Sequence, residues 1–154
     1  MTLRPALPRI RSRSGNALVE MALVLPLLLL VFAGIVDFGF LFQRYEVITN
    51  AAREGARVGV LPGYTPDDAW QRVLDYVQAG LGDGALAAVG TPDVQTITLG
   101  AGTGAPFQAT QVTVNFTYNY VILGPIVSLA TGGTWSPSIT ITARSTMRRE
   151  VFGI

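Results

Sequence analysis

An apolar run without a single charged residue, from Met21 to Val36, constrains this chain more than any other feature. After Asp37 the apolar character resumes and continues to Phe42. As an α-helix rising about 1.5 Å per residue, the segment 21–42 would be roughly 33 Å long, enough to cross a hydrocarbon core of about 30 Å. The sequence therefore predicts a membrane-spanning helix, with Glu20 and Asp37 near its opposite interfaces.

The arginines indicate how such a helix would be oriented. Four of them precede the apolar run, namely Arg4, Arg9, Arg11 and Arg13, whereas only Arg44 follows soon after it. Because basic residues beside a span stay in the cytoplasm, we expect residues 44–154 outside the cytoplasm. A basic leader could instead bind nucleic acid, but no aromatic residue accompanies it, so we do not expect a nucleic-acid partner.

A cleavable secretory signal peptide is the main alternative interpretation of the apolar run. Small residues near Ala33 would allow a cut at Gly34. However, apolar residues continue beyond that point at steps of three and four, at Phe38, Leu41, Phe42, Tyr45, Ile48, Ala52 and Ala56. This stripe predicts one continuous helix that leaves the membrane and ends at Leu61-Pro62-Gly63.

Small residues cluster near the end of this predicted helix. The cluster lies within Ala51, Ala52, Arg53, Glu54, Gly55, Ala56 and Arg57. A missing side chain lets another element approach the helix backbone closely. We therefore predict that this segment is a helix-packing motif.

Composition excludes several classes of chemistry. The 154 residues include no histidine and no cysteine, and all basic residues are arginine. A disulfide, a thiolate metal site, a histidine base and a Schiff-base lysine are therefore impossible. The glycine-rich segment 100–106 lacks the lysine of a phosphate-binding loop. We expect neither enzymatic activity nor a cofactor or metal.

The segment 61–154 is expected to form a small α+β head domain. Thr65, Pro66 and Asp68 have the spacing of a helix N-cap, and Gly80 or Gly82 would end that helix.

Strands are predicted from alternating polar and apolar residues. The alternation is clear over 112–120 and 139–144 and imperfect over 94–99. The apolar stretch 121–130 contains Gly124 and Pro125, and it is compatible with a short helix, a buried loop or an exposed contact patch.

The N-terminal features together resemble a known family. Gly15, followed five residues later by Glu20 and then by an unbroken apolar helix, is the pattern of type IV prepilins and pseudopilins. The segments "GNALVEMALVLPLLLLVFAGIVDFG" and "NAAREGARVGV" are similar to the TadE-like family of the tight-adherence (Flp) pilus system. The resemblance is close over residues 14–60 and weak beyond, apart from "ITITARSTMRRE" near the C-terminus.

This resemblance implies a basic leader over 1–15 that prepilin peptidase removes between Gly15 and Asn16. The mature chain would then consist of a helix over 16–60 and the head. Its new N-terminal ammonium and the Glu20 carboxylate are each costly in an apolar environment, so pairing between adjacent subunits would fix their axial register. The simpler alternative is that Glu20 marks the water-facing end of a membrane anchor.

The resemblance also implies a function in pilus assembly. Met21 after Glu20, together with the sizeable head, departs from the major Flp pilin and favours a minor pilin or pseudopilin that initiates, caps or assists the pilus, and hence acts in adhesion. The implied partners are prepilin peptidase, other pilins and the tight-adherence inner-membrane assembly platform. The implied location is the inner membrane, crossed once, with the head periplasmic or extracellular.

Two alternatives remain open from the sequence. One is a membrane-anchored protein whose outer domain binds a partner without polymerising. The other is a secreted domain released by signal peptidase.

Overall fold

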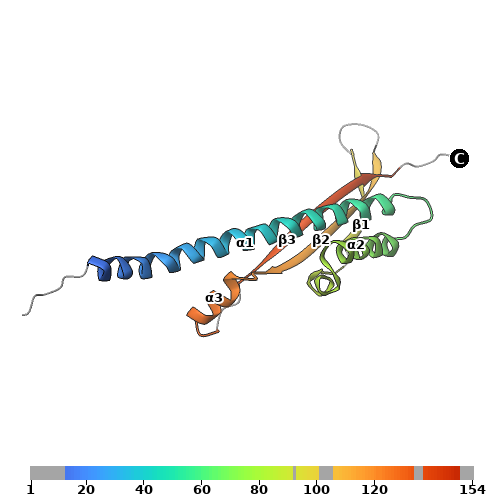
Figure 1. Cartoon of the computed structure of the whole chain (residues 1–154). Coiled ribbons are helices and arrows are strands. Elements are labelled where there is room, and N and C mark those ends of the chain that lie inside the picture. Colours follow the sequence, from blue (N-terminus) through green and yellow to red (C-terminus); the bar gives the residue numbers. More distant parts are fainter. Residues whose placement is uncertain (1–12, 92, 101–105, 134–136, 150–154) are drawn as a thin grey trace, which may run out of the picture.

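The computed structural model describes residues 13–91, 93–100, 106–133 and 137–149. Most of the basic leader and most of the glycine-rich segment 100–106 lie outside these described residues. The elements in chain order are α1 (Arg13–Gly59), α2 (Pro66–Leu81), the 3-10 helix η1 (Asp83–Ala88), β1 (Asp93–Leu99), β2 (Phe107–Asn119), α3 (Leu123–Ala130) and β3 (Ser138–Arg148). A long apolar helix, a further helix and an antiparallel sheet confirm the predicted α+β class (Figure 1).

The two halves of α1 have different surroundings. Every residue from Gly15 to Phe32 is exposed, whereas the C-terminal half packs against α2 and the sheet (Figure 1). The helix continues through Pro26. By length and hydropathy, α1 is the candidate membrane span among the described residues.

The core of the head lies where α1, α2 and the sheet meet. The described strands pair antiparallel in the order β1-β2-β3, which leaves β2 in the centre. Since successive side chains of a strand point to opposite faces, alternate residues of β2 can all face the helices. The buried residues are Ile48, Ala51, Ala52 and Ala56 of α1, Trp70, Val73 and Val77 of α2, Val112, Val114, Phe116 and Tyr118 of β2, and Ile141 and Ala143 of β3.

The predicted start of α2 is confirmed by its hydrogen bonds. The Asp68 backbone N–H donates to Thr65 Oγ1 (3.2 Å), and the Thr65 N–H donates to Asp68 Oδ2 (2.8 Å). This reciprocal capping box satisfies backbone donors that lack partners at a helix start. Gly82 then ends the helix with a φ of +83°, a conformation that favours glycine.

The three predicted strands are also confirmed, with longer bounds. β2 begins at Phe107 and β3 continues to Arg148. β3 pairs with β2 from Ala109↔Arg148 to Asn119↔Ser138, which accounts for the length of β3. The pairing of Phe107 with Leu99 of β1 accounts for the earlier start of β2.

The side of α1 that is buried against the head coincides only in part with the apolar stripe. Phe38, Phe42 and Tyr45 belong to the stripe, yet their exposed fractions are 55%, 64% and 49%. The side of α1 that faces the head runs instead through Asp37, which is fully buried, and Arg44, which is half-buried. Hydropathy alone favours aromatic over charged residues at buried positions, but a charged side chain can be buried when hydrogen bonds satisfy it.

Candidate functional site

The residues predicted to direct processing lie at the start of α1. Gly15 and Asn16 belong to its first turn, and Glu20 follows about one turn later. All three are exposed. In Figure 1 the sheet, α2 and α3 lie away from this end of the helix. The Glu20 carboxylate is therefore accessible to a neighbouring molecule rather than enclosed by its own head.

The small residues of the predicted packing motif are buried, and Gly55 among them lies against α2. Ala51, Ala52, Gly55 and Ala56 are buried. A Cβ added to Gly55 would lie 2.5 Å from Val73 Cγ2 and 3.0 Å from the Ala69 carbonyl oxygen. Because real Cβ atoms do not approach other atoms so closely, the contact between α1 and α2 requires glycine at this position.

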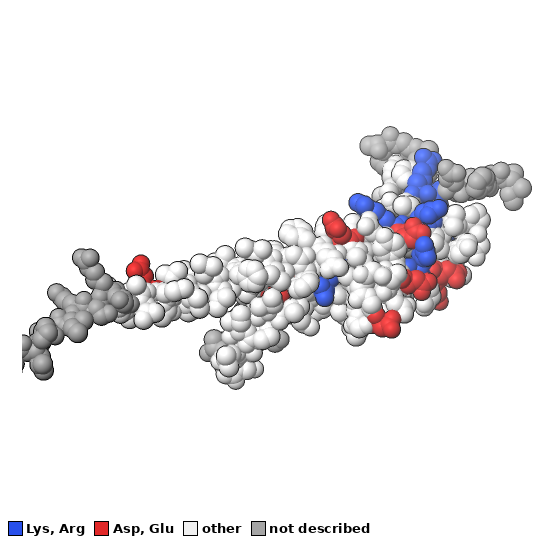
Figure 2. All heavy atoms as spheres, viewed as in Figure 1, with Lys and Arg blue, Asp and Glu red and all other residues white. Residues whose placement is uncertain are grey.

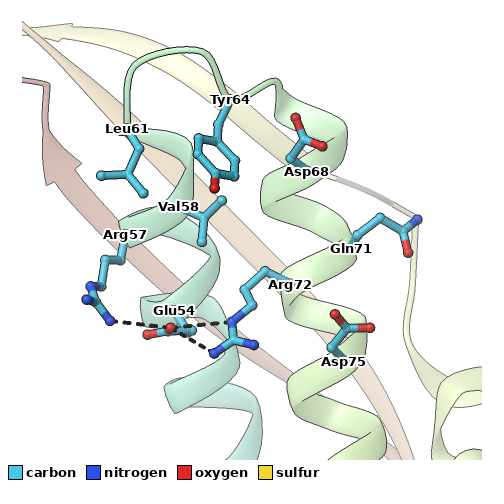
Figure 3. A pocket seen from close by; sticks show the side chains of 9 residues that line it. All are labelled: Glu54, Arg57, Val58, Leu61, Tyr64, Asp68, Gln71, Arg72 and Asp75. Atoms are coloured by element: carbon cyan, nitrogen blue, oxygen red, sulfur yellow. Dashed lines mark hydrogen bonds and ion pairs between the residues drawn. The ribbon is translucent and has the colours of Figure 1, made fainter.

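The charged residues of the same motif lie at the surface. Glu54 Oε1 accepts hydrogen bonds from Arg72 Nη2 (3.1 Å) and Nε (3.3 Å) of α2, and it forms a longer ion pair with Arg57 (3.5 Å), as Figure 3 shows. These side chains line an open groove between α1 and α2, together with Tyr64 and Asp75 among others. Exposed ion pairs contribute about 0–1 kcal/mol each. The groove therefore shows opposite charges on α1 and α2 that match one another, and it gives no indication of a catalytic site.

Asp37 occupies the most polar environment within the apolar part of α1. Its side chain is fully buried at the junction of β2 and α3. Asp37 Oδ1 accepts hydrogen bonds from the backbone N–H groups of Val121 (2.8 Å) and Ile122 (3.1 Å), and Oδ2 accepts from those of Leu123 (2.6 Å) and Ile122 (3.1 Å). The Tyr118 hydroxyl donates to Oδ1 at 3.2 Å.

This carboxylate caps α3 from a different helix. The N-cap residue of α3, Ile122, provides no side-chain hydrogen bond of its own. The first N–H groups of a helix have no partner within it and form a positive end that favours an anion. Asp37 therefore satisfies the start of α3 and fixes it beside α1, where Ala33, one turn before Asp37, is also buried.

Tyr118 and Arg44 surround the capped junction. The Arg44 guanidinium lies over the Tyr118 ring, 5.1 Å from its centroid, and over the Phe40 ring at 5.8 Å. Burial, followed by the charge of Asp37 and the hydrogen bond to it, raises the pKa of the Tyr118 phenol. The phenol therefore remains protonated at neutral pH and continues to donate to Asp37.

Asp37 was expected near a membrane interface, and the sequence indicated no partner for it. The signal that could have identified its role is the isolated acid inside an apolar helix, because an ionisable residue in such a helix usually has a specific partner. The partner amides are 84 to 86 positions away in sequence. Local spacing could not identify them.

Nearly the whole of α1 is covered by one family comparison. The model of the TadE-like protein family matches residues 15–57. These residues form a TadE-like segment. The match begins at Gly15 and includes Glu20, Asp37 and the small residues, and it confirms the resemblance predicted over 14–60. No curated protein and no solved structure matches the chain.

The TadE-like segment lies within α1, and α2 and the sheet lie beyond it. The TadE-like family is not a family of enzymes. Among the residues that the structure describes, no group of three or more acidic side chains is placed to hold a metal ion.

Proposed function

We propose that this chain is a minor pilin or pseudopilin of a tight-adherence pilus, anchored in the inner membrane by α1. The observation that carries the proposal is the TadE-like match beginning at Gly15, on a helix whose apolar residues are exposed as far as Phe32. Burial of each large apolar side chain contributes about 1.5–3 kcal/mol. A helix exposing such side chains over five turns is therefore stable in lipid or among other subunits, and not in water.

The start of the TadE-like segment is compatible with processing by prepilin peptidase between Gly15 and Asn16. The cut would create an ammonium group at Asn16, four residues before Glu20. Along a helix this separation is about 6 Å, and the Glu20 carboxylate is exposed at the surface of α1. An exposed carboxylate can accept the ammonium group of an adjacent subunit, and this pairing between subunits would set their axial register.

The proposed topology follows from the arginines. The leader, with the arginines that precede α1, stays in the cytoplasm, and the head lies in the periplasm or outside the cell. The partners are prepilin peptidase, other pilins and the inner-membrane assembly platform. The protein assists assembly, initiation or capping of the pilus and thereby adhesion.

Mass spectrometry of the N-terminus of the native protein tests the processing step. The proposal predicts a mature chain that begins with Asn16, and it predicts that Gly15→Glu retains the leader. A native chain that begins at Met1 would favour a non-polymerising anchor, and one that begins near Gly34 would favour a secreted domain. Either result would reject the pilin interpretation.

A reporter enzyme that is active only in the cytoplasm tests the topology. Fused after Ile154, it should be inactive when the full chain is expressed. Activity of this fusion would overturn the proposed orientation.

Charge variants of Glu20 test the register step. Glu20→Gln keeps the shape of the side chain and removes its charge, and Glu20→Ala removes both. We expect both variants to be processed and to accumulate in the inner membrane, with few or no pili. Glu46→Gln, at an exposed position of α1 beyond the proposed span, is the matched control and should form pili normally. Normal piliation of both Glu20 variants would reject the register role.

A further inference from the structure

We propose that α3 is a second membrane-contacting element, whose apolar side chains insert among the lipid chains of the leaflet nearest the head, beside α1. The proposal rests on the membrane-spanning role proposed for α1. Five observations support it: the absence of charge around α3, its exposed apolar surface, its position along α1, the partners of its polar groups, and the aromatic and arginine residues next to it.

The sequence around α3 carries no charge. No acidic or basic residue occurs between Asp93 and Arg144. Figure 2 agrees, because the charged side chains visible on this face gather mainly over the α2 and sheet end of the molecule, whereas the surface of α3 is white. A helix that faces water normally presents charged residues on its outer side.

The outer surface of α3 is apolar as well as uncharged. Leu129 and Ile126 of α3 have exposed fractions of 87% and 40%, and Val121, two residues before α3, has one of 50%. Single exposed apolar residues are ordinary, but α3 lies beside α1, whose large apolar side chains are exposed along its N-terminal half as far as Phe32. The two helices therefore present neighbouring apolar surfaces rather than isolated side chains.

The position of α3 corresponds to a depth inside the predicted span. α3 starts where Asp37 caps it, and it extends from the end of β2 back toward the N-terminal end of α1 (Figure 1). Asp37 precedes Phe42, the last residue of the predicted span, by five residues, which is about 7–8 Å along a helix. If 21–42 crosses the membrane, α3 lies at the level of the hydrocarbon and not above it.

Polar groups at both ends of α3 have partners within the protein. In the hydrocarbon region, a backbone or hydroxyl group needs a partner within the protein. The N–H groups at the start of α3 donate to Asp37. The Ser128 hydroxyl donates to the Pro125 carbonyl (2.9 Å), and the Thr131 hydroxyl donates to the Val127 carbonyl (2.8 Å).

The residues just beyond this level resemble a membrane interface. Arg44 lies between the rings of Phe40 and Tyr118, and the Tyr118 and Tyr120 rings meet edge to face at 5.5 Å. Aromatic rings and arginines are typical of the boundary between lipid and water. A second copy of the chain could also cover α3, but continuity with the lipid-facing surface of α1 favours lipid.

Nitroxide labels on single cysteines distinguish these surroundings. The chain has no native cysteine, so each variant carries one label. The full chain is placed in vesicles of phosphatidylethanolamine and phosphatidylglycerol, labelled at Leu129→Cys, at Leu23→Cys in the proposed span, or at Asp75→Cys on α2. Spin relaxation is measured with oxygen, which concentrates in lipid, and with a water-soluble nickel chelate.

We expect the label at position 129 to resemble that at 23, with strong relaxation by oxygen and weak relaxation by nickel, and the label at 75 to show the reverse. Strong nickel relaxation at 129, with 23 still in lipid, would overturn the insertion of α3 and leave the membrane span intact. Weak relaxation by both reagents at 129 would show that protein covers α3, which also overturns the proposal. Strong nickel relaxation at 23 would instead refute the proposed membrane span itself.

Discussion

Removal of the Asp37 carboxylate should release α3 from α1. In Asp37→Ala, the N–H groups of Val121, Ile122 and Leu123 lose their acceptor. A buried donor left without a partner costs about 1–3 kcal/mol, and the loss of an N-cap typically costs about 1 kcal/mol. In a micelle the released α3 can move out of the detergent and hydrogen-bond with water, so these costs do not add fully there, and we expect about 3 kcal/mol.

Amide hydrogen exchange measures this local opening directly. Since about 1.4 kcal/mol corresponds to a tenfold change, a loss of about 3 kcal/mol predicts a roughly 100-fold faster exchange of the Val121, Ile122 and Leu123 amides in detergent micelles. The amide of Val114, in the centre of the sheet, should keep its protection because α3 is not part of the core. Asp37→Asn retains one acceptor oxygen and should show an intermediate effect.

Asp75→Ala is the matched control, because Asp75 is an exposed carboxylate on α2. It should leave the exchange of all these amides unchanged. If Asp37→Ala also leaves the three amides at the start of α3 as protected as in the parent chain, the proposed capping is wrong. If the hydrogen exchange of the Val114 amide is accelerated as much as that of the three amides, Asp37 stabilises the whole head and not α3 alone.

Three further predictions concern the head and the junction. Gly55→Ala should lower the free energy of unfolding by about 1–3 kcal/mol, because the new Cβ overlaps the Val73 side chain. Gly39→Ala should leave it unchanged, because its new Cβ meets open space. Thermal melting followed by circular dichroism compares the stability of the two variants. The capping-box hydrogen bonds hold the pKa of Asp68 below its ordinary value. The stability that they contribute is therefore present above the pKa of the unfolded state and is lost as the pH falls through the pKa of the folded state. In Asp68→Asn the melting temperature should depend less on pH in this acidic range. Tyr118→Phe should accelerate exchange at the start of α3 less than Asp37→Ala does, because one hydrogen bond of about 1–2 kcal/mol is lost and the backbone bonds remain.

The elements that could be predicted from sequence are those governed by local rules. The N-cap of α2 depends on Thr65 and Asp68, three residues apart, and the strands depend on alternation over neighbouring residues. The predicted span likewise depends on a continuous apolar run. Such patterns identify an element because the physical cause lies within a few residues of its effect.

The parts that could not be predicted depend on contacts between distant segments. Whether the stretch 121–130 forms a helix depends on a cap that α1 provides, so its own sequence left three possibilities. The side of α1 that packs on the head could not be predicted for the same reason, because Asp37 and Arg44 are accommodated by Tyr118 and the start of α3. Their hydropathy indicates exposure, and only the partners make burial favourable.

Asp37 lies where the surroundings of α1 change. The C-terminal half of α1 packs against α2 and the sheet, and the N-terminal half, from Gly15 to Phe32, is exposed and rich in large apolar residues. Asp37 lies between them, where α3 returns from the sheet toward the apolar half (Figure 1). A helix that starts within lipid has no water to hydrogen-bond its first N–H groups, so the acceptor must come from the protein. The effect of Asp37→Ala on the protection of α3 should therefore be larger in a bilayer than in micelles if α3 inserts into lipid, and equal in both if α3 lies in water.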